Sequence, residues 1–435
     1  MKSIRFLALA ALLAAPAARA VTLDDAIAAA LDSSPTLQAA EARIDSAQAM
    51  LRQAKSYYYP SIGLSANYAL SDNPPQAFMM TLNQRQLNMQ DPAFNPNEPD
   101  DTENLRGSVG AQWRLFDLQR AAGKNMARFG ARASAEAFAA ARNQLVHEVT
   151  RGYYGALQAR AFADVQAKSV ASIEESLRIA RERFDAGGAV KTDVLNLETQ
   201  LAQANEDLIK ARNGAQLAIA ALNAAIGTDL VAADTLQSPD PSALGAPPPE
   251  CKDPDAFHNR PELRAAAFMR QIKEQDLKKA QGGYAPTVSA FASYDLDSDG
   301  SSDFENSYMA GLQAEINIFD GARTRAAVQA AKAELAAAKA DEDKARLNLR
   351  LDLQQAFLGT KEAWERLEVT RKSLETAEEA RRIVQEQYQQ GAADISILLQ
   401  TQVGVTAMQT RNAAAQYDYL TALSNLKRAK GELVD

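Results

Sequence analysis

The chain has 435 residues, of which 46% are hydrophobic, and its formal net charge is −8 at pH 7. A protein that binds nucleic acid needs a basic face, so this acidic composition argues against that class. The single cysteine, Cys251, excludes a disulfide framework and a zinc site built from several cysteines.

The first twenty residues have the composition of a secretory signal peptide. Lys2 and Arg5 supply a basic start, residues 6–15 form an apolar stretch, and residues 18–20 form a small-residue cleavage site. The apolar stretch is too short to cross a bilayer as a helix. We therefore expect residues 1–20 to be removed and the mature chain to be exported.

The rest of the chain contains an internal repeat, with a first copy over residues 21–237 and a second over 255–435. The aromatic-x-x-glycine segment Phe184–Gly187 recurs 204 residues later as Tyr388–Gly391. Each copy predicts the same order of elements: a helix, two strands joined by a loop, a long helix, a turn and a returning helix. Residues 238–254, with three consecutive prolines, form the predicted linker.

Each copy contains two segments that alternate apolar and polar residues with a period of two. These segments span residues 61–70 and 108–115 in the first copy, and 287–296 and 308–318 in the second. Between the first two, the Asn-, Pro- and Asp-rich residues 71–104 predict a long surface loop. Each segment has about the length of a tilted strand that crosses a bilayer. A half-buried sheet of a soluble protein gives the same alternation, so both interpretations stay open at this point.

Two exceptionally long helices are predicted after the strands. Residues 119–185 and 322–390 contain no proline, and each segment would extend roughly 100 Å as a helix. The returning helices carry apolar heptad seams, from Val194 to Ala225 and from Leu398 to Ala429. Two polar residues interrupt the second seam: Thr401 and Asn412. These features predict two coiled-coil hairpins.

Four amphipathic strands cannot form a closed sheet, because both edges would keep unpaired backbone groups. If the strands cross a membrane, the chain must therefore associate with further copies of itself. Assemblies of two, three or four copies all satisfy this requirement.

The motifs in both copies together resemble the TolC-type outer-membrane efflux family. The resemblance rests on residues 23–37, on the two turns at 184–195 and 388–399, and on the Phe-Asp pairs that begin at Phe116 and Phe319. It spans essentially the whole mature chain. Each motif alone is weak, but the duplicated set at matched spacing is specific.

This resemblance implies a mainly α fold with β. Long antiparallel α-helical coiled-coil hairpins and four membrane-spanning β-strands per subunit would form a trimeric twelve-stranded β-barrel, continuous with an α-helical periplasmic tunnel. The protein would lie in the outer membrane of a Gram-negative type envelope, in contact with outer-membrane lipid, and extend into the periplasm.

The implied function is that of an exit duct in a tripartite efflux system. The homotrimer would passively export small molecules delivered by an inner-membrane pump, of RND or ABC type, and a periplasmic adaptor (membrane fusion protein). One alternative is the outer-membrane component of a type I protein-secretion system, and another is a soluble periplasmic coiled-coil adaptor. We expect no enzyme activity, cofactor, metal or nucleic-acid partner, because the sequence has no convergent catalytic set and no metal-ligand spacing.

The resemblance also implies functional residues. The turns would form adaptor-docking tips, although plain helix caps explain their glycines equally well. The tip candidates are Phe184, Gly187, Thr192, Leu195, Tyr388, Gly391, Ser396 and Leu399. The candidates for a closable aperture are Asp193, Asp394, Ile397 and Gln400, and those for the barrel lumen are Arg114 and Glu315. The best-known family members carry aspartates and an arginine after the second turn, where this chain has Ala393, Ile397 and Gln400, so the resemblance does not extend to a double acidic ring.

Overall fold

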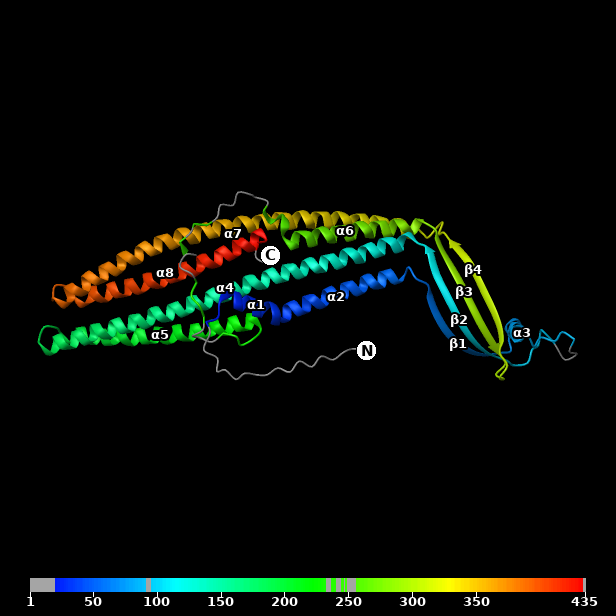
Figure 1. The fold of residues 1–435 in the computed structure, drawn as a ribbon, viewed down its shortest axis with the longest axis horizontal. Helices are drawn as coiled ribbons and strands as arrows, with labels where there is room; N and C mark the ends of the chain where they lie inside the picture. The colour runs from blue at the N-terminus through cyan, green and yellow to red at the C-terminus, as the bar shows by residue number, and fades with distance from the viewer. Residues whose placement is uncertain are drawn as a thin grey trace. The chain divides into compact units, whose positions relative to one another are not determined.

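The computed structural model describes residues 20–90, 95–231, 236–239, 244–245, 247–248 and 256–432. Residues 1–19 of the predicted signal peptide, most of the predicted linker and Cys251 lie outside this part of the chain. The described elements follow one another in this order: α1 (Leu23–Ser33), α2 (Pro35–Ser56), β1 (Ser61–Ser71), α3 (Pro74–Asn83), β2 (Thr102–Phe116), α4 (Leu118–Asp185), α5 (Lys191–Ile226), η2 (Ala256–Asn259), α6 (Pro261–Gln281), η3 (Gly282–Tyr284), β3 (Thr287–Ser298), β4 (Glu305–Glu315), α7 (Arg323–Gln389) and α8 (Ile395–Lys430) (Figure 1).

The chain divides into two compact units, and each unit draws on both sequence repeats. The hairpin unit comprises the described residues within Met1–Glu41, Ala137–Leu263 and Arg346–Asp435, and the sheet unit those within Ala42–Glu136 and Arg264–Ala345. Helices α4 and α7 contribute residues to both units. The repeat therefore describes how elements recur along the chain, while the compact units mix the two copies.

The sheet unit contains one antiparallel sheet with the strand order β1-β2-β3-β4 (Figure 1). Its register aligns the apolar residues of all four strands on one face. Leu64 lies opposite Val109, Val109 opposite Tyr294, and Tyr294 opposite Tyr308. Since side chains alternate between faces, Ser65, Ser108, Asp295 and Ser307 share the other, polar face. The predicted strands are present, but β2 begins at Thr102 and β4 ends at Glu315, so the predicted strand over 308–318 extends too far.

The segment predicted as a loop over 71–104 is partly helical, which corrects that prediction. Helix α3 begins at Pro74 and Pro75, a favourable composition for a first turn. Directly after α3, the Gln84 amide donates to the main-chain oxygen of Glu103 over 2.6 Å and to Asn104 Oδ1 over 3.0 Å. Asn104 in turn donates to the buried Asp297 carboxylate over 2.7 Å. These contacts attach the segment to the ends of β2 and β3.

The two Phe-Asp pairs mark the change from strand to long helix. Asp117 Oδ1 accepts the backbone N–H of Gln119 over 2.8 Å at the start of α4. Asp320 Oδ2 accepts the backbone N–H of Thr324 over 3.0 Å at the start of α7. A carboxylate at this position satisfies backbone donors that the helix itself leaves unpaired, which explains why the pair occurs in both copies.

The predicted heptad seam of the first returning helix is the packed side of α5. Every seam residue from Val194 to Ala225 is buried or half-buried, and Leu197 and Leu222 are fully buried. Burial of one leucine contributes about 2 kcal/mol. The seam packs against α4 through residues such as Ile173 and Ala180. Within the part of the chain that the structure describes, no helix is both long enough and apolar enough to cross a membrane.

A charged cluster in the hairpin unit connects the start of α6 to α7 and α8. Arg260 is 4% exposed and pairs with the carboxylates of Asp352 and, over 2.7 Å, Glu262. Arg428 also contacts Asp352, over 2.8 Å. Burial alone would raise the pKa of Asp352, but hydrogen bonds from Arg428 and Arg260 outweigh it, so the pKa is lowered. The ionised carboxylate therefore stabilises the folded unit.

We expect Asp352→Asn to destabilise the protein by about 3 kcal/mol at pH 7, because the buried Arg260 and its neighbour Arg428 lose their ionised partner. Because the folded-state pKa of Asp352 lies below its ordinary value of 3.8, the stability from its ionised form is present above that value. It is lost as the pH falls through the folded-state pKa. Thermal unfolding followed by circular dichroism should therefore show a difference between wild type and variant at pH 7 that shrinks below about pH 4. A difference independent of pH would contradict this role.

Candidate functional site

The turn between α4 and α5 ends the first hairpin with a left-handed glycine. Gly187 has a φ of +78°, and its N–H donates to the main-chain oxygen of Phe184 over 2.9 Å. The N–H of Gly188 donates to the main-chain oxygen of Arg183 over 2.7 Å. These bonds satisfy carbonyl groups at the end of α4. A Cβ at Gly187 would meet no atom within 4 Å, so the backbone conformation alone selects glycine here.

The turn between α7 and α8 repeats this geometry. Gly391 also has a φ of +78°, and its N–H donates to the main-chain oxygen of Tyr388 over 3.0 Å. Helix α8 then begins with Asp394 as its N-cap, since Oδ1 accepts the N–H of Ser396 over 3.1 Å. The predicted pair of aromatic-x-x-glycine turns thus forms two equivalent hairpin tips.

One arginine connects the two tips. Arg183 Nη1 donates to the main-chain oxygen of Tyr388 over 2.6 Å, and Nη2 donates to that of Gly188 over 3.2 Å. Its guanidinium also lies 5.0 Å from the centre of the Tyr388 ring, within the range of a cation–π interaction. The second copy has Gln387 at the equivalent position. The side chain that connects the tips therefore comes from the first repeat only. Arg183 is not among the site residues predicted from the sequence.

Tyr388 is the buried centre of this arrangement. Its side chain is only 3% exposed, whereas that of Phe184, its equivalent in the first copy, is 41% exposed. Burial raises the pKa of the Tyr388 hydroxyl; the Arg183 charge acts in the opposite direction, and the carboxylates of Asp193 and Asp394 add to the rise. The structure therefore brings the two candidate aspartates and Arg183 near the same ring.

The remaining predicted tip residues differ in their exposure. Thr192, Leu195 and Ser396 are exposed, while Leu399 packs partly against the core of the hairpin unit. Tyr388 is buried in the core of the hairpin unit, so its side chain contacts neighbouring core residues. Among the aperture candidates, Asp193 is half-buried, and three are exposed: Asp394, Ile397 and Gln400.

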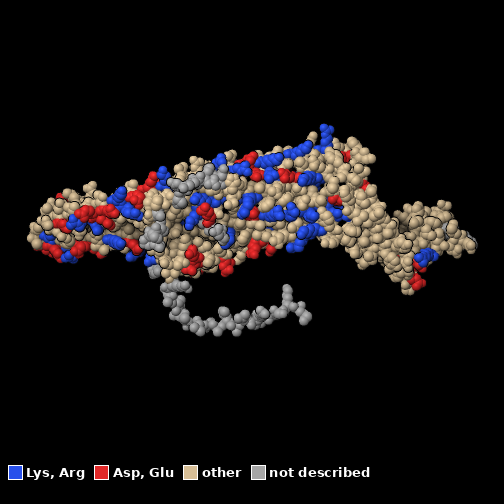
Figure 2. Space-filling model, turned by 45° about the horizontal axis from the view of Figure 1, so that its top comes forward, with Lys and Arg blue, Asp and Glu red and all other residues tan. Residues whose placement is uncertain are grey.

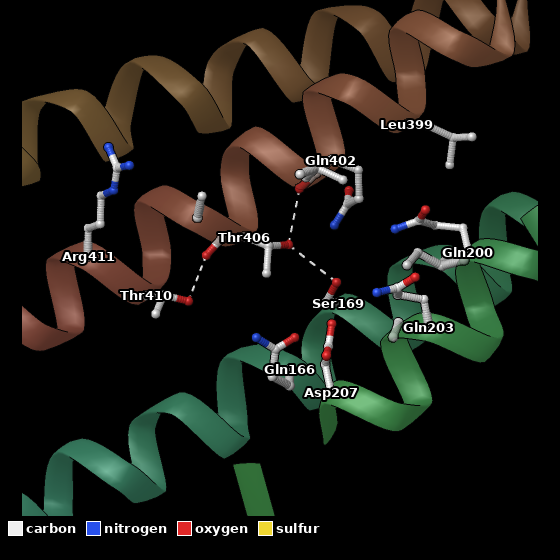
Figure 3. Close-up of a pocket in the computed structure, with 14 residues that line it drawn as sticks. Gln166, Ser169, Gln200, Gln203, Asp207, Leu399, Gln402, Thr406, Thr410 and Arg411 are labelled. Atoms are coloured by element: carbon white, nitrogen blue, oxygen red, sulfur yellow. Dashed lines mark hydrogen bonds between the residues drawn. The ribbon is translucent and has the colours of Figure 1, made fainter. Parts of the chain in front are cut away.

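A polar groove of about 470 Å³ lies between α4, α5 and α8 (Figure 3). Thr406 Oγ1 of α8 donates to Ser169 Oγ of α4 over 3.2 Å, and Ser172 Oγ donates to Gln402 Oε1 over 3.1 Å. Figure 3 shows Gln200 of α5 facing α8 across the groove. The two hairpins thus meet through hydrogen bonds here, in the region where polar residues interrupt the second heptad seam.

The two lumen candidates belong to the ends of their strands. Arg114 is exposed, and its guanidinium lies 3.4 Å from the Asp117 carboxylate. Glu315 is exposed at the last position of β4. The register places Arg114 opposite Ser289, on the polar face of the sheet. Among the described residues, no group of three His, Cys, Asp or Glu side chains is arranged to hold a metal ion.

The sequence matches one protein family and several curated proteins over most of its length. The family described as outer membrane efflux protein matches residues 26–228 and 254–432. Protein CyaE of Bordetella pertussis is 27% identical, with 95% of this chain and 84% of CyaE aligned. The alkaline protease secretion protein AprF of Pseudomonas aeruginosa is 24% identical, over 77% of this chain and 71% of AprF.

Among solved structures, the outer membrane protein VceC of Vibrio cholerae has a TM-score of 0.79 at 18% identity. The match covers 94% of this chain and 96% of VceC. At 18% identity, this similarity shows a shared fold and nothing more specific. The predicted fold class, with long helical hairpins and four strands per subunit, is confirmed.

Proposed function

This chain belongs to the outer membrane efflux protein family and is an outer-membrane channel that extends into the periplasm; from that premise we propose that three copies form the exit duct of a tripartite efflux system. An inner-membrane pump and a periplasmic adaptor would supply the energy and deliver small molecules. The observation that carries this function is the family match, which spans both repeats.

The trimer is supported by the two free edges of the sheet. Among the strands of the described residues, β1 and β4 each pair with one strand only, and each has eleven residues. An edge strand exposes a row of unpaired N–H and C=O groups, and such groups cannot stay unpaired inside a bilayer. Pairing of β1 with β4 of the next copy satisfies both edges, and three copies give a closed sheet of twelve strands.

The adaptor-docking role of the tips is supported by what they expose. Phe184 and Leu195 present large apolar side chains at 41% and 49% exposure, beside the exposed Thr192. Such residues are suited to a partner that also has apolar side chains. Asp193 and Asp394, both near Tyr388, are the proposed aperture residues, together with Ile397 and Gln400.

Purified protein is expected to run as a trimer in detergent and to form ion-conducting pores in planar bilayers. Native mass spectrometry gives the number of copies, and single-channel recording gives the conductance. A monomer without conductance would contradict both the trimer and the duct.

Type I protein secretion remains a second candidate, because AprF is by name a protease secretion protein. Deletion of the gene separates the two functions. Increased sensitivity to small toxic molecules with an unchanged set of exported proteins supports efflux. The loss of an exported protein with unchanged sensitivity supports secretion. The family assignment favours either channel over a soluble periplasmic adaptor.

A further inference from the structure

We propose that a basic pocket in the sheet unit binds the phosphate headgroup of an anionic membrane phospholipid. This inference rests on the membrane location in the proposed function. The pocket has a volume of about 290 Å³ and lies where α2, the end of β2, α4 and α6 meet. The residues that line it are Ala54, Tyr57, Arg114, Asp117, Gln119, Arg120, Gly123, Lys124 and Lys279.

The charges in this pocket favour an anion. Four of its lining residues are cationic and one is acidic. The acidic residue, Asp117, lies beside Arg114 and caps α4. Within the described part of the chain, neither Lys124 nor Lys279 forms an ion pair. Two ammonium groups are therefore available to a phosphate.

Arg120 adds to this positive charge and fixes the shape of the pocket. Its guanidinium donates to the main-chain oxygens of Tyr57, over 3.0 Å, and of Arg114. Its Nε is buried and has no hydrogen-bond partner among the described residues. The carbonyl groups hold the guanidinium in place but do not neutralise it, so the pocket keeps its positive charge.

Aromatic contacts connect the pocket to the apolar face of the sheet. Trp113 lies on that face, opposite Ala290, and its indole N–H donates to the main-chain oxygen of Tyr58 over 2.9 Å. The Tyr58 ring in turn lies 4.1 Å from the Arg120 guanidinium and 4.8 Å from Lys124 Nζ. In a closed sheet with a polar interior, the apolar face contacts lipid. The lysine side of the pocket thus adjoins the lipid-facing surface.

The side chains around the pocket are typical of the membrane depth at which lipid headgroups lie. Tyr57 and Tyr59 are 62% and 73% exposed at the end of the strands. Exposed Tyr and Trp residues gather at the boundary between the hydrocarbon core and water. Figure 2 shows the sheet as a mostly uncharged surface, with Lys and Arg on the helices that adjoin it. Basic pockets at this boundary bind anionic headgroups.

The test compares two double variants of the full chain, purified in detergent. Lys124→Gln with Lys279→Gln removes the two free charges of the pocket. The control, Lys55→Gln with Lys278→Gln, removes the same charge from exposed neighbours that do not line it. Phosphatidylglycerol is titrated into each protein, and bound lipid is counted by native mass spectrometry. Phosphatidylcholine and inorganic phosphate serve as separate probes.

The pocket variant is expected to bind phosphatidylglycerol about 30-fold more weakly, from about 1 kcal/mol for each basic residue. The control should bind within about twofold of wild type. Equal affinity of both double variants would overturn the proposal, and so would displacement of the lipid by equimolar inorganic phosphate. Wild-type conductance is recorded from the same preparation. A conducting trimer with equal affinities refutes the lipid site alone, whereas a wild type that does not conduct refutes the proposed function.

Discussion

Arg183→Gln should increase the fraction of time that a single channel is open, because it removes the side chain that connects the two hairpin tips. The variant loses the bonds to the main-chain oxygens of Tyr388 and Gly188 and the contact with the Tyr388 ring. Loss of a charged donor from a partly exposed site is worth about 2 kcal/mol. If the tips form the closable aperture, this energy shifts the ratio of open to closed apertures by about 30-fold. Recording in planar bilayers measures the change directly.

Two control variants separate this contact from a general loss of charge. Gln387→Ala changes the equivalent position of the second repeat, where the exposed side chain has no such role. Arg382→Ala removes an arginine whose ion pairs among the described residues are with Glu379 and Glu386, on the surface of α7. Both controls should conduct like the wild type. An unchanged open fraction in Arg183→Gln itself would show that the connection between the tips does not control the aperture.

Gly187→Val should reduce transport by more than tenfold while the trimer still assembles. A β-branched residue at a φ of +78° is strained by about 2 kcal/mol, so the turn has to rearrange. The rearrangement displaces Phe184 and Thr192 at the proposed docking surface, which lies away from the strands in sequence. Survival of a deletion strain that carries the variant, on a panel of toxic small molecules, measures transport. Native mass spectrometry measures assembly.

The neighbouring glycine provides the matched control. Gly188 does not share the left-handed conformation, and a Cβ there would make only an ordinary contact of 3.6 Å with the main-chain oxygen of Arg183. Gly188→Ala should therefore transport normally. Gly391→Val is expected to behave like Gly187→Val, and normal transport in both valine variants would refute the assignment of the tips.

Features encoded by neighbouring residues could be predicted from the sequence. The heptad seam from Val194 to Ala225 has its own period, and the same residues are buried in α5. The glycines at 187 and 391 follow a long helix, which is a local signal for a helix end. The strand faces follow from simple alternation, and the register of the sheet confirms them.

Features that depend on distant partners could not be predicted. Arg183 contacts Tyr388, which is 205 residues away, so no pattern around Arg183 reveals the connection. Helix α3 was missed because Asn, Pro and Asp dominate its surroundings. Its attachment depends on Gln84 reaching residues at the start of β2. The polar groove likewise requires Ser169 and Thr406 to meet across two hairpins. The predicted limits of the repeats and the roles of the aperture and lumen residues remain predictions.

The difference between Arg183 and Gln387 has a consequence for symmetry. Two similar hairpins in each of three subunits would give a ring of six hairpins, with a pseudo-sixfold axis. Only alternate hairpins would carry the guanidinium, so the ring would keep true threefold symmetry at its narrow end. Widening that end would then require breaking three equivalent connections rather than six, and a ligand that binds one kind of hairpin would be enough to release them.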